Sequence, residues 1–537
     1  MIREISYYSN MAVGLYRLIG HPPLRDPAAA LREQMEHREE RFLELAREIV
    51  FAHPEHPYHE MFRLAGCGYQ DLADSVGRQG LENTLSSLAR EGVYLAHDEF
   101  KGKTPIVRGG REIRSTPGSF LNPRTRGYIE TRSSGSRSSG TPTRKSTEFR
   151  MYREVHAHLE LLEFGLDSRV CAQVRPILPS SMGLGTSVRY WRRGRKIEKW
   201  FSMRGTLPDS GHYRFVTGAL VLLGRGLGAS MPMPTYLPGN DFSPVARWLA
   251  AQKRQGNTCV LRSYVSPAVR VAVAARDAKL DISGTIFMVD GEALTDAKRA
   301  EIEAAGCEAY PKYSISEVGN IGHGCRHMRT GNCVHVFRDA VAVISRVRRA
   351  PLSDADVNSL LFTNLLPVAP RFLINAEMDD AGILEPAACQ CEYSKAGMNQ
   401  QLRDIFSYGK LTGQGVTLHG SDVVRILEDA LPRRFGGAAG DYQLVEREGR
   451  GQTQLDLRVS PRVRSAATVE IRDFFLSQLE SQYGGALAAR QWRHSQGLQV
   501  VVEEPSTTPS GKLLPLHILS SERASEGTSR VQHVATA

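Results

Sequence analysis

Apolar residues recur at three- and four-residue intervals near the start of the chain. Between residues 28 and 52 these positions are Leu31, Met35, Phe42, Leu45 and Ile49, with acids and bases between them. This spacing places the apolar side chains on one face of a helix. The sequence therefore predicts an amphipathic helix here and a helical N-terminal region.

From about residue 100 to residue 350 the pattern changes to short β-branched runs that alternate with helix-like segments. GTIFMVDG at 284–291 and AVAVISRV at 340–347 have the composition of buried strands, and DAKRAEIEAAG at 296–306 has the composition of a helix. Alternation of this kind is typical of βαβ units. We expect an α/β body with mixed sheets flanked by helices.

Two segments break this rhythm and suggest the domain organisation. The run TRSSGSRSSGTPTR at 131–144 has no periodicity, which predicts a loop, and after Gly409 the pattern becomes that of a small α+β unit. We expect an N-terminal domain at 1–408 and a C-terminal domain at 409–521. The polar residues 522–537 are expected to form a flexible tail.

Composition places the chain among soluble globular proteins, since 41% of the residues are hydrophobic and 23% are charged. These values exclude collagen, coiled-coil and wholly disordered chains. No run approaches the roughly 18 apolar residues that span a bilayer, and MIREISYYSN has no apolar signal core, so we expect a cytoplasmic protein. The net charge of +10 suits anionic partners such as nucleotides, CoA, acidic proteins or nucleic acid without choosing among them.

The Gly/Ser loop has the composition of a phosphate-binding loop, because flexible glycines let backbone N–H groups surround an anion. Thr141-Pro142 follows Gly140 where a Walker motif requires Lys and then Ser or Thr. A kinase or GTPase loop is therefore disfavoured. Taken alone, this segment fits both a flexible linker and a phosphate site, whose candidate residues are Ser133, Ser134, Gly135, Ser136, Gly140 and Thr141.

Four later segments, taken in order with this loop, carry a resemblance to a known family. They are VDGEALTDAKRAEIEAAG at 289–306, YSISE at 313–317, LLFTNLLPVAPRFLINAEMDDAG at 360–382 and PSTTPSGKLLPL at 505–516. Together they resemble the adenylate-forming superfamily, specifically its branch of phenylacetate-CoA ligases and related acyl-activating enzymes. The resemblance spans about residues 50–520.

The resemblance implies an enzyme that uses ATP and Mg²⁺ to convert a carboxylic acid to an acyl-adenylate, with release of pyrophosphate. CoA is the implied acceptor, and a small C-terminal lid carries the catalytic lysine, Lys512. Ser316 is implied at the α-phosphate and Glu317 at Mg²⁺, whose preference for carboxylate oxygen suits the residue. The implied nucleotide-binding residues are the loop residues given above together with Gly291, Glu292, Tyr313 and Asp380.

The chain departs from the family pattern at the hinge, in the phosphate loop and after Cys391, where the Gly-Arg that commonly follows is missing. The hinge segment reads IFSYGKLTGQGV at 405–416, where Lys410 stands in for the usual arginine, and Arg137-Ser138 lengthens the phosphate loop. These departures bear on ATP affinity and on the acceptor. The alternatives to CoA are a carrier-protein thiol, a protein cysteine or an amine, and a non-catalytic nucleotide- or nucleic-acid-binding scaffold stays open.

Cysteine spacing suggests a metal site. Cys325, Cys333, Cys389 and Cys391 form two pairs that could close a tetrahedral thiolate site for structural Zn²⁺, with His323, His327 or His335 as substitutes. Four reduced core thiols are the alternative interpretation.

The strongest basic run, RYWRRGRKIEKW at 189–200, has the mixture of arginines and tryptophans found in some nucleic-acid-binding surfaces. A hairpin that turns at Gly194 with a solvated basic face explains it more simply. We therefore expect neither nucleic acid nor a membrane as a partner. The acid substrate and the oligomeric state do not follow from the sequence.

Overall fold

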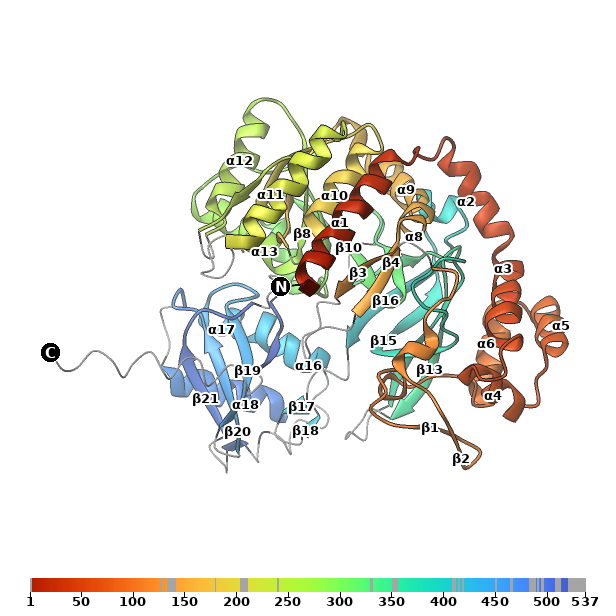
Figure 1. Ribbon diagram of the computed structural model, residues 1–537. Coiled ribbons are helices and arrows are strands. Elements are labelled where there is room, and N and C mark those ends of the chain that lie inside the picture. Colours follow the sequence, from red (N-terminus) through yellow and green to blue (C-terminus); the bar gives the residue numbers. More distant parts are fainter. Residues whose placement is uncertain are drawn as a thin grey trace.

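The structure is a computed structural model, shown as a ribbon in Figure 1. It describes residues 2–125, 128–132, 142–178, 180–202, 211–238, 241–328, 332–349, 356–407, 412–413, 416–417, 420–449, 452–463, 467–481, 489, 492–493, 497–507 and 513–519. Within these residues, no helix has both the length and the apolar content needed to cross a membrane.

A 12-stranded mixed sheet forms the centre of the body, in the order β13-β14-β15-β16-β12-β11-β10-β9-β8-β5-β6-β7. Its parallel half contains β5 (Val170–Val174), β6 (Ile197–Ser202), β7 (Pro234–Tyr236), β8 (Cys259–Tyr264), β9 (Ile286–Asp290) and β10 (Glu308–Ile315). Its antiparallel half contains β11 (Gly319–His323), β12 (Val334–Val336), β13 (Val341–Arg349), β14 (Asp356–Asn364), β15 (Ala376–Pro386) and β16 (Gln400–Ser407). β10 joins the halves, since it pairs parallel with β9 and antiparallel with β11.

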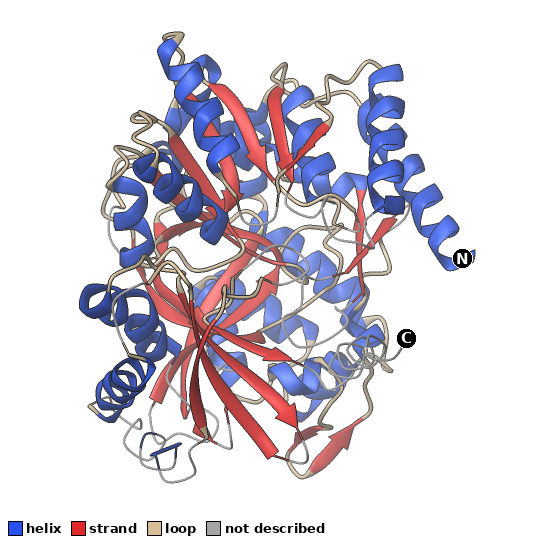
Figure 2. Cartoon of the chain, turned by 90° about the vertical axis from the view of Figure 1, so that its left-hand side faces the viewer, coloured by secondary structure: helices blue, strands red, loops and turns tan. Residues whose placement is uncertain are grey.

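Helices cover both faces of the parallel half, as Figure 2 shows. They are α8 (Thr147–Tyr152), α9 (Glu154–Phe164), α10 (Met182–Trp191), α11 (Gly211–Gly226), α12 (Ser243–Arg254), α13 (Val265–Asp277), α14 (Asp296–Glu303) and the short α15 (Glu392–Lys395). Because successive side chains of a strand point to opposite faces, the sheet has an apolar core on each face. Leu261 and Phe287 pack with α12 and α13, whereas Val260 and Met288 pack with α9 on the opposite face. The predicted α/β class is confirmed by this arrangement.

The N-terminal region is helical, as expected, but the predicted helix over 28–52 is divided. The helices are α1 (Ile2–Gly20), α2 (Pro27–Glu36), α3 (Arg38–Leu45), the π-helical η1 (Ala46–Phe51), α4 (Pro57–Leu64), α5 (Tyr69–Gln79), α6 (Leu81–Arg90) and α7 (His97–Phe100). His37 both ends α2 and begins α3. Phe42, Leu45 and Ile49 are buried against the antiparallel half of the sheet, so the apolar face was identified correctly although the chain bends.

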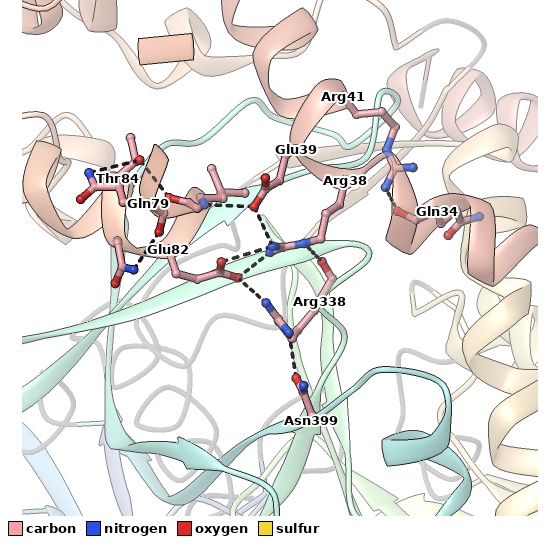
Figure 3. A network of polar contacts seen from close by, with 12 residues as sticks. Gln34, Arg38, Glu39, Arg41, Gln79, Glu82, Thr84, Arg338 and Asn399 are labelled. Carbon is pink, nitrogen blue, oxygen red and sulfur yellow. Dashed lines mark hydrogen bonds and ion pairs between the residues drawn. The ribbon is translucent and has the colours of Figure 1, made fainter. Parts of the chain in front are cut away.

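A polar network holds these helices on the sheet (Figure 3). The Arg38 guanidinium donates to Glu82 at 2.6 Å and to the carbonyl oxygen of Arg338 at 2.8 Å. Arg338 in turn donates to Asn399 at 2.8 Å. Because these residues come from α3, α6, the turn between β12 and β13 and the segment just before β16, the network fixes the helical layer against the body.

The C-terminal unit has a separate four-stranded sheet in the order β21-β20-β19-β22. Its elements are α16 (Gly420–Arg425), the π-helical η6 (Ile426–Ala430), α17 (Leu431–Phe435), β19 (Tyr442–Gly449), β20 (Gln452–Val459), α18 (Thr468–Glu480), β21 (Leu498–Val502) and β22 (Leu516–Leu519). They enclose their own apolar core. Figure 1 shows this unit in blue beside the body. The expected boundary at 408–409 and the tail at 522–537 lie outside the described residues and stay predictions.

Three two-stranded ribbons complete the fold: β1 (Ile106–Arg108) with β2 (Arg111–Ile113), β3 (Tyr128–Arg132) with β4 (Pro142–Ser146), and β17 (Thr412–Gly413) with β18 (Val416–Thr417). The β3–β4 ribbon changes the prediction for 131–144. Thr131 and Arg132 end β3, and Pro142 begins β4, because the two ends pair across the antiparallel ribbon. Both ends of the predicted loop are therefore in strands, since β3 extends into it as far as Arg132 and β4 begins in it at Pro142.

Candidate functional site

The carboxyl end of β10 brings two of the predicted nucleotide-binding residues together. The Tyr313 hydroxyl donates to Oδ2 of Asp380 on β15 at 2.7 Å. Burial and the adjacent carboxylate raise the pKa of Tyr313 well above its usual value, so the hydroxyl stays protonated and remains a donor. The contact joins residues 67 positions apart and fixes one face of the candidate site.

Glu317 lies in the turn between β10 and β11, where it is 5% exposed. Its partner is Lys101, whose Nζ is 2.7 Å from Oε1. Burial opposes ionisation of Glu317, but the Lys101 ammonium holds its pKa below the usual value. The carboxylate is therefore charged, and a cation bound by Glu317 must compete with Lys101. Ser316, half-buried, precedes it in the same turn.

Gly291 and Glu292 follow β9 directly. Gly291 has φ of +83°, in the left-handed region that favours glycine. The Glu292 side chain is 4% exposed, and its carboxylate accepts a hydrogen bond from the Ser266 hydroxyl. Its carboxylate also lies 3.9 Å from Nζ of Lys298. In this structure Glu292 therefore belongs to a polar group at the base of α13 and α14.

Several predicted site residues lie outside the described residues, and their placement stays untested. They are the phosphate-loop residues Ser133, Ser134, Gly135, Ser136, Gly140 and Thr141, the hinge residue Lys410 and the lid residue Lys512.

Three of the four predicted metal-binding cysteines lie together with one histidine. The ligand atoms of Cys325, His335, Cys389 and Cys391 all lie within 4.8 Å of one another. Sγ of Cys389 is 3.8 Å from Sγ of Cys325 and 3.6 Å from Sγ of Cys391. Nε2 of His335 is 3.2 Å and 3.1 Å from Sγ of Cys389 and Cys391.

This geometry fits a tetrahedral metal ion. Zinc–sulfur bonds of about 2.3 Å at tetrahedral angles place two sulfurs about 3.8 Å apart, close to the distances observed. Nδ1 of His335 contacts the Met398 carbonyl oxygen at 2.8 Å, which orients Nε2 toward the thiols as a metal-binding histidine requires. The adjacent Cys325 thiol and the His335 imidazole hold the pKa of Cys391 below its usual value, which favours the thiolate that a metal binds.

Cys333 is not part of this cluster. It lies one residue before β12, whereas His335 lies within β12 and is held by Met398. The substitution of a histidine for one of the cysteines was open on the sequence, and the contacts of His335 with Cys389 and Cys391 favour His335 over Cys333.

The basic run at 189–200 forms the end of α10, a turn and the start of β6, not the predicted hairpin. Gly194 does turn the chain, with φ of +70°. Trp200 is fully buried and donates to the Arg175 carbonyl oxygen at 2.8 Å, so its ring is not available to stack on a base. Arg192 is also buried and pairs with Glu154 at 2.5 Å. These contacts serve packing, which argues against the nucleic-acid interpretation.

The sequence did not indicate the contact of Lys101 with Glu317 or the buried charged group around Lys312. Lys101 lies 216 positions from Glu317, so no local spacing connects the two. Arg262 had a local signal, since it interrupts the apolar strand CVLRSYV with a charge. A charged residue inside an otherwise buried strand is uncommon unless it has a partner.

Comparisons with known proteins give similarity in solved structures alone. No family model matches the chain, and no curated protein does. The chain is similar to a benzoate-CoA ligase from Burkholderia xenovorans, with 11% identity, a TM-score of 0.41, and 91% of this chain and 99% of that chain covered. It is also similar to an anthranilate-CoA ligase bound to anthranoyl-AMP, with 11% identity, a TM-score of 0.40, and 81% and 75% covered.

A third solved structure is one of the fatty acyl-adenylate ligases from E. coli and L. pneumophila, with 12% identity, a TM-score of 0.37, and 72% of this chain and 68% of that chain covered. Two of these structures are described as CoA ligases and the third as a fatty acyl-adenylate ligase. None of them is described as a phenylacetate-CoA ligase.

Proposed function

We propose that this protein activates a carboxylic acid with ATP, releases pyrophosphate and transfers the acyl group from the acyl-adenylate to CoA. The observation that carries the proposal is the contact between Tyr313 and Asp380 at the carboxyl end of β10. Two motifs that are separate in the sequence meet there, at the sheet edge where α/β proteins bind ligands. Glu317 follows in the next turn.

The residues at this edge have complementary roles in the proposal. Asp380 accepts hydrogen bonds from the ribose hydroxyls, and Tyr313 orients that carboxylate while its ring lies along adenine. Glu317 binds Mg²⁺, which offsets the negative charge of the phosphates when it is bound. Lys512, on the lid, approaches the substrate carboxylate and the α-phosphate, where a point charge on a long stem can bring the two anions together.

The acceptor is proposed to be CoA. A carrier-protein thiol, a protein cysteine or an amine is the alternative, since each attacks an acyl-adenylate in the same way. CoA and the alternative acceptors are distinguished by whether the enzyme needs CoA for repeated turnover.

The Cys325, His335, Cys389 and Cys391 cluster is proposed to bind one structural Zn²⁺. Its ligands come from the segment after β11, from β12 itself, and from the segment between β15 and β16. A metal ion there would therefore hold three parts of the antiparallel half together. The proposed chemistry requires only Mg²⁺, and zinc would therefore act through the fold.

The deciding experiment measures pyrophosphate release from MgATP with aryl, short-chain and long-chain acids, each with and without CoA. Release that depends on one acid class and continues only with CoA supports the proposal. Release that stops near one equivalent with CoA present supports the alternative acceptors. The absence of release with every acid contradicts the proposed activity.

The lysine variant tests the mechanism. Lys512→Ala is expected to lose pyrophosphate release while it retains ATP binding, because the proposed role is alignment of the carboxylate. The matched control is Lys196→Ala, which removes an exposed lysine. Unchanged release in Lys512→Ala would remove this residue from the mechanism.

A further inference from the structure

Two neighbouring helices, α1 and α11, pack over β6 and share one apolar core. Their buried side chains include Leu15 and Ile19 on α1 and Leu220 and Val221 on α11. The helices contact one another directly, since a Cβ atom at Gly224 would lie 3.7 Å from Cδ1 of Ile19. Figure 1 shows the two helices side by side at the surface of the body. The inward side of each helix is therefore used by the fold.

The outward side of α11 is also apolar. The buried residues of this helix recur every three or four positions and so lie on one side of it. They are Thr217, Leu220, Val221 and Gly224. The exposed residues that recur in the same way on the opposite side are Phe215, Ala219, Leu222 and Gly226. A helix that is apolar all round normally lies inside a core or in lipid, so within the described chain the outward side of α11 is uncovered.

The outward side of α1 extends this surface. Val13 and Tyr16, three residues apart, are 49% and 60% exposed, and on α11 Phe215 and Leu222 are 79% and 57% exposed. These four side chains, here named the outer apolar face, point away from the core that both helices share. Six of the eleven large apolar side chains that are exposed in the described part of the chain lie on these helices or just after α11. Single exposed apolar side chains are ordinary, but such a concentration marks a binding surface.

The charged residues of the same segments are all positive. Residues 7–20 contain Arg17, and residues 211–233 contain Arg214 and Arg225. All three arginines are exposed. Neither segment contains an aspartate or a glutamate, although the chain has 58 of them. Apolar side chains flanked by arginines are typical of helices that lie along an anionic lipid surface, where the guanidinium groups meet the headgroup phosphates.

Charge favours lipid over a second copy of the chain as the partner of this surface. In a symmetric dimer the same surface would meet itself, and the arginines of both copies would approach one another without carboxylates between them. An anionic bilayer has the opposite charge. Its fluid surface also accepts a projecting side chain such as Phe215 without a preformed pocket.

A surface contact makes different demands from a membrane-spanning helix. The sequence predicts no membrane partner because no run is long enough to cross a bilayer. A helix that lies along the surface has no such requirement, since only one of its sides enters the lipid. Tyr16 suits this position, because an aromatic ring with a hydroxyl group prefers the boundary between headgroups and hydrocarbon.

We propose that α1 and α11 form a docking surface for an anionic lipid bilayer. The outer apolar face enters the headgroup region, and Arg17, Arg214 and Arg225 meet the lipid phosphates. The contact recruits the protein to a membrane reversibly. This inference does not depend on the proposed acid activation, because none of the proposed nucleotide-binding or catalytic residues lies on either helix.

The first test is sedimentation of the full chain with lipid vesicles. One set contains phosphatidylcholine with about one third phosphatidylglycerol, and the other contains phosphatidylcholine alone. We expect at least about tenfold tighter binding to the anionic vesicles, and binding that weakens as the salt concentration rises. No binding to the anionic vesicles, or equal binding to both sets, overturns the proposal.

A pair of double variants tests the outer apolar face. Phe215→Ala with Leu222→Ala should lower the affinity for anionic vesicles at least about tenfold. The matched control is Leu162→Ala with Val469→Ala, since these side chains are 50% and 54% exposed on other helices. The control should bind as the wild type does, and circular dichroism checks that both variants fold. An unchanged affinity in the first variant, or an equal loss in both, overturns the proposal.

An arginine variant tests the charge. Arg17→Gln should weaken binding to anionic vesicles about fivefold and reduce its salt dependence. Arg433→Gln removes an arginine that is 79% exposed on α17 and should bind as the wild type does. Equal effects of the two substitutions contradict the proposal.

Sedimentation equilibrium without lipid tests the other occupant. A dimer that Phe215→Ala with Leu222→Ala dissociates would assign the outer apolar face to a second copy of the chain and overturn the proposal. A monomer, or an oligomer that this variant leaves unchanged, is the expected result and supports it, because the face is then open to lipid.

Discussion

Lys298 provides the sharpest test of how the C-terminal unit is attached to the body. This lysine on α14 is 3% exposed, and its Nζ lies 2.7 Å from Glu428 in η6 and 3.9 Å from Glu292. Thr295 also donates to Glu428, at 2.5 Å. Although burial lowers the pKa of Lys298, the two carboxylates hold it above its usual value, so the amine is charged.

The expected loss in the free energy of unfolding depends on which charges remain after each substitution. Two unit charges 2.7 Å apart attract by about 6 kcal/mol at an effective dielectric of about 20, and desolvation offsets part of this. Removing one member of a buried pair typically costs about 3–5 kcal/mol. Lys298→Met leaves two carboxylates facing each other and should lie at the upper end. Glu428→Gln leaves Lys298 beside Glu292 and should cost about 1–2 kcal/mol, close to the value of one charged hydrogen bond.

The assay is urea unfolding followed by far-ultraviolet circular dichroism and by tryptophan fluorescence, since Trp492 is buried in the C-terminal unit. The double variant Lys298→Met with Glu428→Leu should be more stable than Lys298→Met alone, because it removes the stranded charge. Arg433→Met is the control, since it breaks an exposed pair with Asp429 of the same segment and should cost less than about 1 kcal/mol.

The pH dependence of the stability of Lys298→Met provides a second check. In Lys298→Met, burial and like charge raise the pKa of one carboxylate in the folded state, so stability is lost as the pH rises through that value and recovered on acidification. Equal costs for Lys298→Met and Glu428→Gln, or a Lys298→Met variant less stable in acid than at neutral pH, would refute the reasoning.

Three further predictions concern other sites. Tyr313→Phe removes the hydrogen bond to Asp380 and should weaken ATP binding about 5–10-fold, about 1 kcal/mol, in isothermal titration calorimetry; unchanged affinity would place Asp380 away from the nucleotide. Elemental analysis of the purified protein should find about one zinc per chain. Cys391→Ser should lower the zinc affinity at least about tenfold, the usual effect of disturbing a metal site. A metal-free wild type with an unchanged melting temperature would contradict a structural zinc. His56 caps α4 by accepting from the Tyr58 N–H at 3.2 Å, and burial lowers its pKa to about 4. Stability should therefore fall as the pH drops from about 6.5 to about 4, by about 1–3 kcal/mol; His56→Asn should flatten this loss in acid unfolding curves, and an unchanged slope would exclude the residue.

Local patterns in the sequence determined the type of each major element. The apolar spacing around Phe42 and Leu45 identified the buried face of the N-terminal helices, and the βαβ alternation identified the α/β class. Such inferences succeed because hydrophobic burial acts through the side-chain periods of helices and strands, which are properties of short segments. The break at His37 was missed because α2 and α3 pack into different apolar cores, which local spacing does not encode.

The motifs likewise indicated Tyr313, Glu317 and Asp380, since each lies in a segment whose order along the chain resembles a known family. Only the tertiary structure showed that Tyr313 and Asp380 touch and that Lys101 pairs with Glu317. Contacts between residues tens to hundreds of positions apart depend on strand order and register, which no local spacing encodes.

The same distinction holds for the cysteine–histidine cluster and for the charged group around Lys312. The sequence by itself determined that cysteines and histidines suited to a metal were present, but it did not single out Arg262 or Lys312. The tertiary structure places His335, and not Cys333, together with Cys325, Cys389 and Cys391. The parallel alignment of β8, β9 and β10 decided that Lys312 shares a face with Asp290 and Arg262. Composition sets which charges a chain must bury, but strand pairing decides which of them meet.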